Sequence, residues 1–428
     1  MKKLTLFLLA SLMSAVMVFA GGNQAASNAG PGVVRWSFWG GESRIKNTQL
    51  AIDKFTEQTG IIVAAEPAPG TADHFSKFKT QFVGGNAADI VQLGGDFSNL
   101  QVEDVGSVLL SLDDLVKRGI IDLSKVDAAA IAGGTVNGHL YALPLAANMP
   151  AIVYNKSLLE RVGAPLPKVS FASWDEFRQW LVDVKAKLPA GVYPFADNSA
   201  NSDQSYFFGY WARDNGTPQW DGVKSSLTAA DAKKYFDMWA DFRAAGLIPP
   251  AETAADYDEL NESTSSLIAG KVAGSVLWSN MLVNYQRATP DTLDLIEFPH
   301  ATTSNALWGQ MSQMMGINKN SKNAEAAAKF INYRVNTADV WKIMGADPGT
   351  PVNSDGRAVL PSDAVTDRIT AYMNIAGKHA SARDPNIPGD SQWGQSLYLI
   401  SQNVSYGRIT TAQAGQQVVD LIAQLTRK

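Results

Sequence analysis

Apolar and polar residues follow two different periods along the first part of the chain. In residues 33–39 (VVRWSFW) alternate side chains are apolar, and this spacing predicts a β-strand. Residues 42–59 carry apolar side chains at helical spacing, and Gly60 is typical of a helix end. Apolar runs at 61–65 and 88–93 predict two more strands with a helix between them. The resulting β-α-β-α-β order is typical of a parallel sheet, whose ligands bind beyond the carboxyl ends of the strands.

The segment 133–163 contains two extended runs that a proline separates. Asn137-Gly138 provides two residues that tolerate positive φ, so the pattern predicts a two-residue β-hairpin turn. Pro144 has no backbone N–H and should end the following strand. A new apolar run starts at residue 151. A chain that leaves one sheet at a proline and enters another at once is a candidate crossover between two lobes.

Toward its end the chain changes character, and the last third shows helical patterns without strands. A helix is predicted at 257–269, and from residue 337 to the end the pattern is mostly helical. These last helices must pack on sheets that earlier segments form. The chain should therefore cross between the lobes more than once, near residues 143–146, 297–300 and 333–337.

The first residues predict export rather than structure. Residues 1–20 combine two lysines, an apolar run and a small-residue end, which is typical of a cleaved signal peptide. The apolar run is short for a membrane-spanning helix. Residues 21–32 are small and polar and are predicted to form a disordered tether. The chain has no cysteine, which excludes disulfides and a lipid attached through an N-terminal cysteine, so we expect a periplasmic protein.

Composition narrows the function classes. With 46% apolar and 18% charged residues the chain is globular, and its net charge is −5. Without residues 1–20, which hold two lysines and no carboxylate, the charge becomes −7, so nucleic acid is not an expected partner. No serine-hydrolase, zinc-protease or phosphate-loop motif occurs, and the four histidines are scattered. We therefore expect no catalytic activity, no metal and no cofactor.

Five motifs in order resemble a known family. The run from Gly138 to Leu158, with GHLYALP and YNKSL, resembles a segment of the family 1 extracellular solute-binding proteins. These are sugar-binding components of ABC importers related to maltose-binding protein. SWDEF (173–177), GKVAGSVLW (270–278), GINKNSKNAEAAAKFINY (316–333) and GTPVN (349–353) follow in the family's order.

The resemblance implies an α/β fold of the periplasmic-binding-protein type (type II-like), with two discontinuous lobes joined by hinge crossovers around a ligand cleft. Lobe 1 would comprise 33–143 plus 298–334, and lobe 2 would comprise 144–297 plus 335–428. The ligand would be a monosaccharide or short oligosaccharide, captured by lobe closure. The implied partners are the permease subunits of an ABC transporter, and the protein itself would be a monomer.

Candidate site residues follow from the chemistry of a sugar. A pyranose needs flat apolar groups for its C–H face and fixed donors and acceptors for its hydroxyls. Tryptophans at predicted strand ends and loops, with nearby polar residues and glycines, meet this need. The candidate ligand-binding residues are Trp39, Gly40, Glu42, Asp96, Asn148, Trp211, Trp278, Asn280, Trp308, Gly309, Arg383 and Trp393.

Several of these residues have a second interpretation. Asp96, the first choice among the polar residues, corresponds to an acidic sugar ligand in the maltose-binding relatives, and its alternative role is to cap the next helix. Glu42 would suit the helix dipole, and Trp211 would suit helix packing. Arg383 could cover the ligand or pair with the neighbouring Asp384.

Two positions depart from the relatives. Asn148 is an amide where the relatives have a carboxylate, and Asn280 stands where they have an aromatic residue, which Trp278 could replace. The candidate loops show no charge excess, which favours a neutral saccharide. A polyol, a glycerophosphodiester or a polyamine stays open as the ligand, and a secreted carbohydrate-active enzyme is the further alternative.

Overall fold

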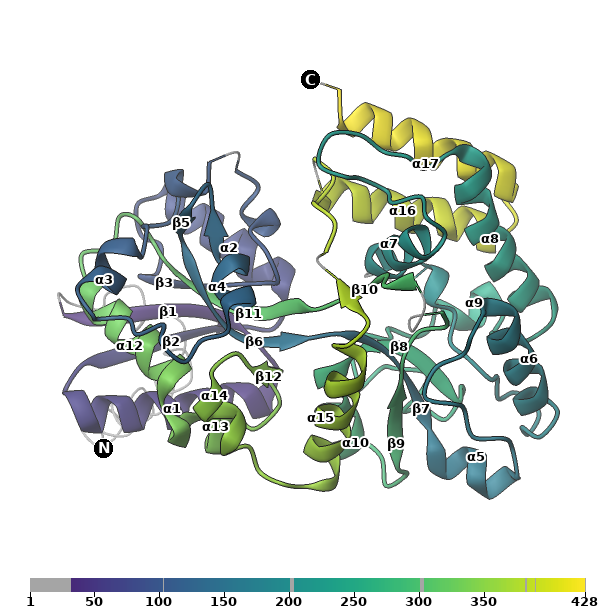
Figure 1. Ribbon diagram of the computed structural model, residues 1–428, viewed down its shortest axis with the longest axis horizontal. Coiled ribbons are helices and arrows are strands. Elements are labelled where there is room, and N and C mark those ends of the chain that lie inside the picture. Colours follow the sequence, from purple (N-terminus) through teal and green to yellow (C-terminus); the bar gives the residue numbers. More distant parts are fainter. Residues whose placement is uncertain are drawn as a thin grey trace, which may run out of the picture.

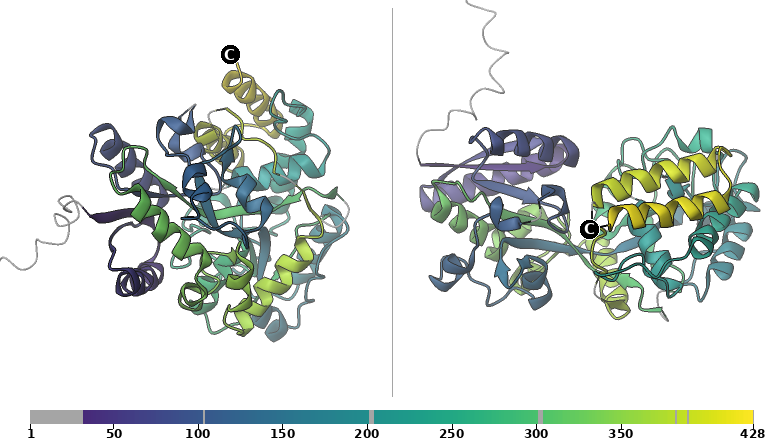
Figure 2. Two further views of the ribbon diagram at one scale, coloured as in Figure 1. Left: turned by 60° about the vertical axis from the view of Figure 1, so that its left-hand side comes forward. Right: turned by 90° about the horizontal axis from the view of Figure 1, so that it is seen from above.

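The structure is a computed structural model that consists of two lobes side by side, joined by a few chain segments (Figure 1, Figure 2). It describes residues 32–102, 104–200, 204–300, 304–381, 383–388 and 390–427. The signal peptide predicted at 1–20 and the tether predicted at 21–32 therefore lie outside the described residues, apart from Gly32. Within the described ranges, no helix has both the length and the apolar character that crossing a membrane requires.

Lobe 1 is built on a six-stranded sheet of order β12-β6-β11-β3-β1-β2. Its strands β1 (Val33–Trp39), β2 (Ile62–Ala68) and β3 (Ile90–Leu93) are parallel neighbours, and α1 (Glu42–Thr59) and α2 (Thr71–Val83) connect them. The predicted β-α-β-α-β unit is thereby confirmed, and so are the bounds of its first strand and first helix. The carboxyl ends of β1 and β3 point toward the second lobe (Figure 1).

Antiparallel strands and helices complete lobe 1. The added strands of the sheet are β6 (Ala142–Asn148), β11 (Gln310–Ile317) and β12 (Thr350–Pro351). The other elements are η1 (Ser98–Leu100), η2 (Val105–Ser107), α3 (Asp113–Lys117), α4 (Ala128–Gly133), α12 (Ala324–Asn336), α13 (Ala338–Met344), α14 (Ser354–Ala358) and the hairpin of β4 (Thr135–Val136) and β5 (His139–Leu140). The predicted hairpin turn is confirmed, because Asn137 and Gly138 both have positive φ, 51° and 82°.

Lobe 2 has a three-stranded antiparallel sheet of order β8-β7-β9, covered by helices. Its strands are β7 (Pro150–Asn155), β8 (Gly274–Trp278) and β9 (Leu293–Ile296), and a separate pair joins β10 (Leu307–Trp308) to β13 (Ala380–Ser381). Its helices are α5 (Lys156–Val162), α6 (Trp174–Lys185), η3 (Asn198–Ala200), α7 (Gln204–Asp214), α8 (Ala229–Ala244), α9 (Ala251–Ala254), η4 (Ser279–Met281), α10 (Leu282–Arg287), α15 (Ala364–Ala376), α16 (Asp390–Ser405) and α17 (Thr411–Leu425). Residues 257–269 form turns, so the helix predicted there is wrong.

The chain crosses between the lobes at places other than those predicted. It passes from β6 to β7 at Met149, from β10 to β11 at Gly309, and from α14 to α15 through residues 359–363. The first crossover comes later than expected because Pro144 lies inside β6. It pairs with Met314 at a register shift of β11, and a strand tolerates a missing N–H at such an irregularity.

The other two predicted boundaries shift because of packing. Phe298 and Trp308 belong to the apolar core of lobe 2, so residues 298–300 and 304–308 do not belong to lobe 1 as the prediction had them. Val335 and Trp341 pack in the core of lobe 1, and β12 pairs with β6. Residues 335–352 therefore belong to lobe 1, although the helical pattern placed them in lobe 2.

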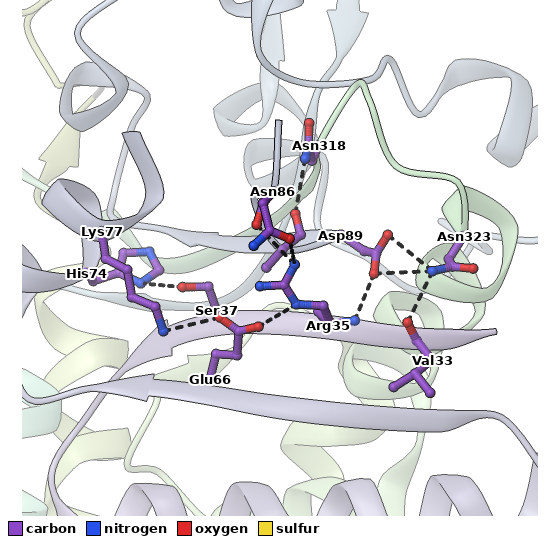
Figure 3. Close-up of polar contacts among 11 residues, drawn as sticks. Val33, Arg35, Ser37, Glu66, His74, Lys77, Asn86, Asp89, Asn318 and Asn323 are labelled. Atoms are coloured by element: carbon purple, nitrogen blue, oxygen red, sulfur yellow. Dashed lines mark hydrogen bonds and ion pairs between the residues drawn. The ribbon is translucent and has the colours of Figure 1, made fainter. Parts of the chain in front are cut away.

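A buried polar network fixes β1 within lobe 1 (Figure 3). The guanidinium of Arg35 donates to Glu66 on β2 over 2.6 Å, and its backbone N–H donates to the carboxylate of Asp89 over 2.8 Å. His74 of α2 bridges β1 and β3, with Nδ1 at 3.2 Å from the hydroxyl of Ser37 and Nε2 at 2.8 Å from a main-chain carbonyl of β3. These contacts hold the strand that ends in Trp39.

Glu297, just after β9, is fully buried, and neither carboxylate oxygen has a hydrogen-bond partner among the described residues. Burial raises its pKa, although the charge of His379 acts in the opposite direction. The carboxyl group therefore has a higher pKa in the folded protein than in the unfolded chain. Its protonated form contributes fully to stability below the pKa of the unfolded chain, and this contribution is lost as pH rises through the pKa of the folded protein.

Glu297→Gln should therefore stabilise the protein above that folded pKa, on the order of 1–3 kcal/mol at mildly alkaline pH, because the amide cannot ionise. The gain should vanish in acid below the pKa of an exposed glutamate. Urea unfolding at several pH values measures this difference. A constant difference between the two proteins across that range would contradict the assignment of a buried, ionising carboxylate.

Candidate functional site

A cavity of about 170 Å³ lies between the two lobes. Lobe 1 contributes the ends of β1 and β6, the first turn of α1 and the start of β11, and lobe 2 contributes the end of β8 and the turn after it. Its lining residues are Trp39, Arg44, Asn148, Trp278, Asn280, Met281, Gln310, Ser312 and Gln313. Three of these elements reach the cavity at the carboxyl end of a strand, where ligands of α/β sheets bind. We call this space the main cavity because strand ends of both lobes meet there, although a separate cavity of about 400 Å³ is lined by parts of α10, α13 and the start of α15.

Two indoles reach the main cavity from opposite lobes. Trp39 ends β1 and packs beside His74 and Phe75, with ring centroids 5.1 and 5.8 Å away. Trp278 ends β8 and packs on Tyr206 at 4.7 Å. Both indoles are only partly buried, because each is the last residue of a strand that leaves its sheet at the cleft. Each lobe therefore offers an aromatic surface to a molecule between them.

Amide side chains surround these indoles. Asn148 is buried at the end of β6, and its Oδ1 has no hydrogen-bond partner among the described residues. Asn280 donates from Nδ2 to the main-chain oxygen of Asp347 over 2.9 Å, which joins lobe 2 to lobe 1. The described residues that line the main cavity include no carboxylate. Such a wall can both donate to and accept from hydroxyl groups.

Arg44 is a cavity residue that sequence reasoning missed. It lies in the first turn of α1, and its Nε donates to Oδ2 of Asp347 over 2.8 Å. Its side chain runs close over Gly40, where an added Cβ would lie 2.6 Å from Cδ of Arg44. A glycine at this position is what permits the arginine to take this path. No local sequence pattern marks Arg44 as a cavity residue, because its partner carboxylate is 303 residues away in the chain.

A second, smaller cavity of about 20 Å³ lies within lobe 2 beside the main one. Tyr206 in its wall contacts Trp278, and Arg383 in its wall lies 3.3 Å from Oε1 of Gln310, so the two cavities are adjacent. Its lining residues are Tyr206, Gly209, Arg213, Gln219, Trp308, Arg383, Asp384, Pro385, Asn386 and Trp393. Trp308 and Trp393 are almost fully buried here, and their indole nitrogens have no partner among the described residues.

Asp96 joins the lobes rather than lining either cavity. Its Oδ1 accepts hydrogen bonds from the N–H and the hydroxyl of Ser98. Its Oδ2 accepts from Nη1 of Arg383 over 3.0 Å and from Nδ2 of Asn386 over 2.7 Å. Burial by itself raises the pKa of Asp96, but the charge of Arg383 and the hydrogen bonds outweigh burial and lower it. The carboxylate therefore stays ionised and connects β3 to the 383–388 loop of lobe 2.

Three other candidates lie outside the cavities. Trp211 is buried in the aromatic core of lobe 2 against Tyr235, with a centroid distance of 5.6 Å. Glu42 is exposed at the start of α1, and Gly309 marks the crossover between β10 and β11. Neither cavity is lined by these three candidates or by the candidate Gly40, which the side chain of Arg44 covers.

Other proteins resemble this chain in sequence and in fold. Residues 51–371 match a family model described as a bacterial extracellular solute-binding protein. A putative binding protein of Brucella abortus is 25% identical over 286 residues, which are 63% of this chain and 65% of that relative, so the match spans less than two thirds of the relative's length. A carbohydrate ABC transporter substrate-binding protein of Streptococcus pneumoniae is 26% identical over 234 residues, 52% of this chain and 45% of that one.

Among solved structures, a periplasmic oligogalacturonide-binding protein from Yersinia enterocolitica, in complex with saturated digalacturonic acid, has a TM-score of 0.79 at 23% identity. The alignment covers 92% of this chain and 100% of the other. The predicted fold, two α/β lobes with a cleft between them, is thereby confirmed.

Proposed function

We propose, from the premise that this chain belongs to the bacterial extracellular solute-binding proteins, that it captures a saccharide between its lobes and delivers it to a membrane permease. One observation carries the proposal. Trp39 and Trp278 reach one cavity from opposite lobes, and most of the polar lining consists of amides and a hydroxyl. Indoles suit the C–H face of a pyranose, and amides suit its hydroxyls.

The energetics of this arrangement fit a transport ligand. A stacked indole can bury up to roughly 150–250 Å², and half of that burial gives about 2–3 kcal/mol. The amide side chains in the wall offer partners for ligand hydroxyls, since a buried polar group left without a partner costs about 1–3 kcal/mol. Two stacks and a few such hydrogen bonds can reach the approximately −8 kcal/mol of micromolar binding after ordering costs.

The lobe contacts described above suit a closing cleft. Asp96 with Arg383, and Asp347 with Asn280, connect the lobes beside the cavities. A ligand that touches both lobes adds to these contacts only when the lobes are together, so it favours closure. The rims of the closed lobes would then meet the permease of an ABC transporter.

Location and partners belong to the same proposal. The family is extracellular, and the pattern of residues 1–20 supports export to the periplasm by a cleaved signal peptide. Names of relatives point the same way, since one is a carbohydrate ABC transporter substrate-binding protein and another binds an oligogalacturonide. We propose a monomer that releases its ligand unchanged, so labelled oligosaccharides should survive incubation without bond cleavage.

The alternatives fit the cavity less well. A polyamine needs several carboxylates, and the described lining of the main cavity has none. A polyol or a glycerophosphodiester would use the amides but would leave the two indoles without a flat partner. A saccharide uses both kinds of group.

Replacing Trp39 or Trp278 with alanine should weaken saccharide binding by roughly 30- to 100-fold, because each change removes a stack worth about 2–3 kcal/mol. Calorimetric titration against a panel of saccharides, polyols and phosphodiesters measures the change. Trp174→Phe is the matched control, since Trp174 lies on α6 and lines neither cavity. Binding of a non-saccharide alone, or equal losses in the control, would refute the proposal.

A further inference from the structure

Lobe 1 holds one guanidinium in the wall of the main cavity and a second one that no carboxylate of the described residues neutralises. Arg44, which lines the cavity, uses Nε and Nη2 on Asp347, at 2.8 and 3.3 Å. Its Nη1 has no partner among the described residues, so one edge of this guanidinium stays available. Glu42 on the same turn is exposed and does not line the cavity.

A second guanidinium lies close enough to Arg44 for the two charges to interact. Arg334, in the last turn of α12, is only 2% exposed and sits 5.4 Å from the ring centroid of Trp36. Its Nε and Nη1 are buried without a hydrogen-bond partner, and no carboxylate of the described residues forms an ion pair with it. Burial, together with the nearby charge of Arg44, lowers its pKa to about 10, so it stays charged at neutral pH.

The remaining charges near the cavities are balanced. Arg383 pairs with Asp96 at 3.0 Å, and Arg213 pairs with Asp384 at 3.6 Å. Arg44 pairs with Asp347, whereas Arg334 has no carboxylate partner among the described residues, so the charge of Arg334 is left unneutralised and acts on Arg44. A buried guanidinium without a carboxylate costs stability, so its presence calls for a compensating role.

We infer that the saccharide taken by this protein carries a carboxylate, as a uronate does, which binds at the free edge of Arg44 and is favoured by the unneutralised charge of Arg334. The inference rests on the proposed function and replaces the neutral sugar that the sequence favoured. A guanidinium edge matches the planar carboxylate, and a single excess charge matches a monoanion better than a phosphate dianion. The amides and indoles would hold the rest of the sugar.

Calorimetric titration of the purified chain with matched ligands tests the inference. The ligands are the monoanion galacturonate, neutral galactose and galactose phosphate. Digalacturonate and the neutral digalactoside of the same linkage extend the comparison to disaccharides. We expect the uronate to bind at least about tenfold more tightly than its neutral partner, and the preference to shrink as salt rises. Equal or tighter binding of the neutral sugar, or of the sugar phosphate, would overturn the inference while the saccharide function stands. If neither kind of saccharide binds, the proposed function itself fails.

The variant Arg334→Met separates this role from a structural one. Removing a buried, unpaired charge should raise the urea midpoint, yet it should weaken uronate binding about tenfold and leave neutral-sugar binding unchanged. Arg334→Lys keeps the charge and should keep most of the preference. If Arg334→Met changed the affinity for uronate and for neutral sugar by the same factor, the inference would be overturned. It would also be overturned if the variant bound both sugars as tightly as the wild type does.

Discussion

Replacing Arg35 with methionine is expected to lower the free energy of unfolding by about 3–5 kcal/mol, because the change leaves a buried carboxylate without its main partner. Glu66 is 3% exposed, and its Oε1 accepts from Nε of Arg35 over 2.6 Å (Figure 3). Lys77 also reaches Glu66, at 3.2 Å, but its side chain is partly exposed and compensates only in part. Arg35 further donates to the main-chain oxygen of Asn86, which ties β1 to the segment before β3.

Urea unfolding of the variant measures this loss, and a surface pair provides the matched control. Arg118 pairs with Glu325 on the exterior of the same lobe, where water screens the pair, so Arg118→Met should cost much less than Arg35→Met. Replacing both Arg35 and Glu66 with apolar residues should recover much of the loss, since the stranded charge disappears with its partner. A cost for Arg35→Met no greater than that for Arg118→Met would show that the network contributes little.

The sequence predicted the elements whose signals are local. The first strand and first helix were bounded correctly, because strict periodicity and Gly60, which has φ of 71°, fall within a few residues of each other. The lobe boundaries depended on distant contacts. Pro144 can lie inside β6 only because β11 is irregular opposite it. Trp341 can be assigned to lobe 1 only from the residues that it packs against. The helix predicted at 257–269 gives way to turns in which Glu259 accepts hydrogen bonds from two serines.

In the candidate site, too, features with a local signal were predicted and features that depend on distant contacts were not. Trp39, Asn148, Trp278 and Asn280 were predicted separately, and all four line one cavity, because strand ends meet at the cleft. Whether they touch a ligand stays a prediction. Asp96 was singled out as a sugar ligand, but Ser98, Arg383 and Asn386 occupy its oxygens, and two of these partners lie nearly 300 residues away. No local pattern could reveal that pairing.

Acidification should destabilise lobe 1 through His74, which is fully buried between β1, α2 and β3. Burial lowers its pKa to about 4; a hydrogen bond to the carbonyl of Gln92 opposes this shift, and the positive charge of Lys77 adds to it. An exposed histidine titrates near 6.5, so the unfolded chain takes up a proton first as pH falls. Stability should therefore be complete above about pH 6.5 and fall by roughly 3 kcal/mol on approach to pH 4.

The variant His74→Gln should remove this slope, because its amide can still donate to the carbonyl of Gln92 but does not titrate. Urea unfolding between about pH 4 and 7 measures the slope, and His139→Gln, at an exposed site, is the control. If the free energy of unfolding changed with pH in the same way in wild type and in His74→Gln, the slope could not be assigned to His74. Since the imidazole lies 5.1 Å from the ring of Trp39, the charge should also disturb the cavity wall. Saccharide affinity should then fall within the same pH range in wild type but not in His74→Gln, which would link the buried network of lobe 1 to ligand capture.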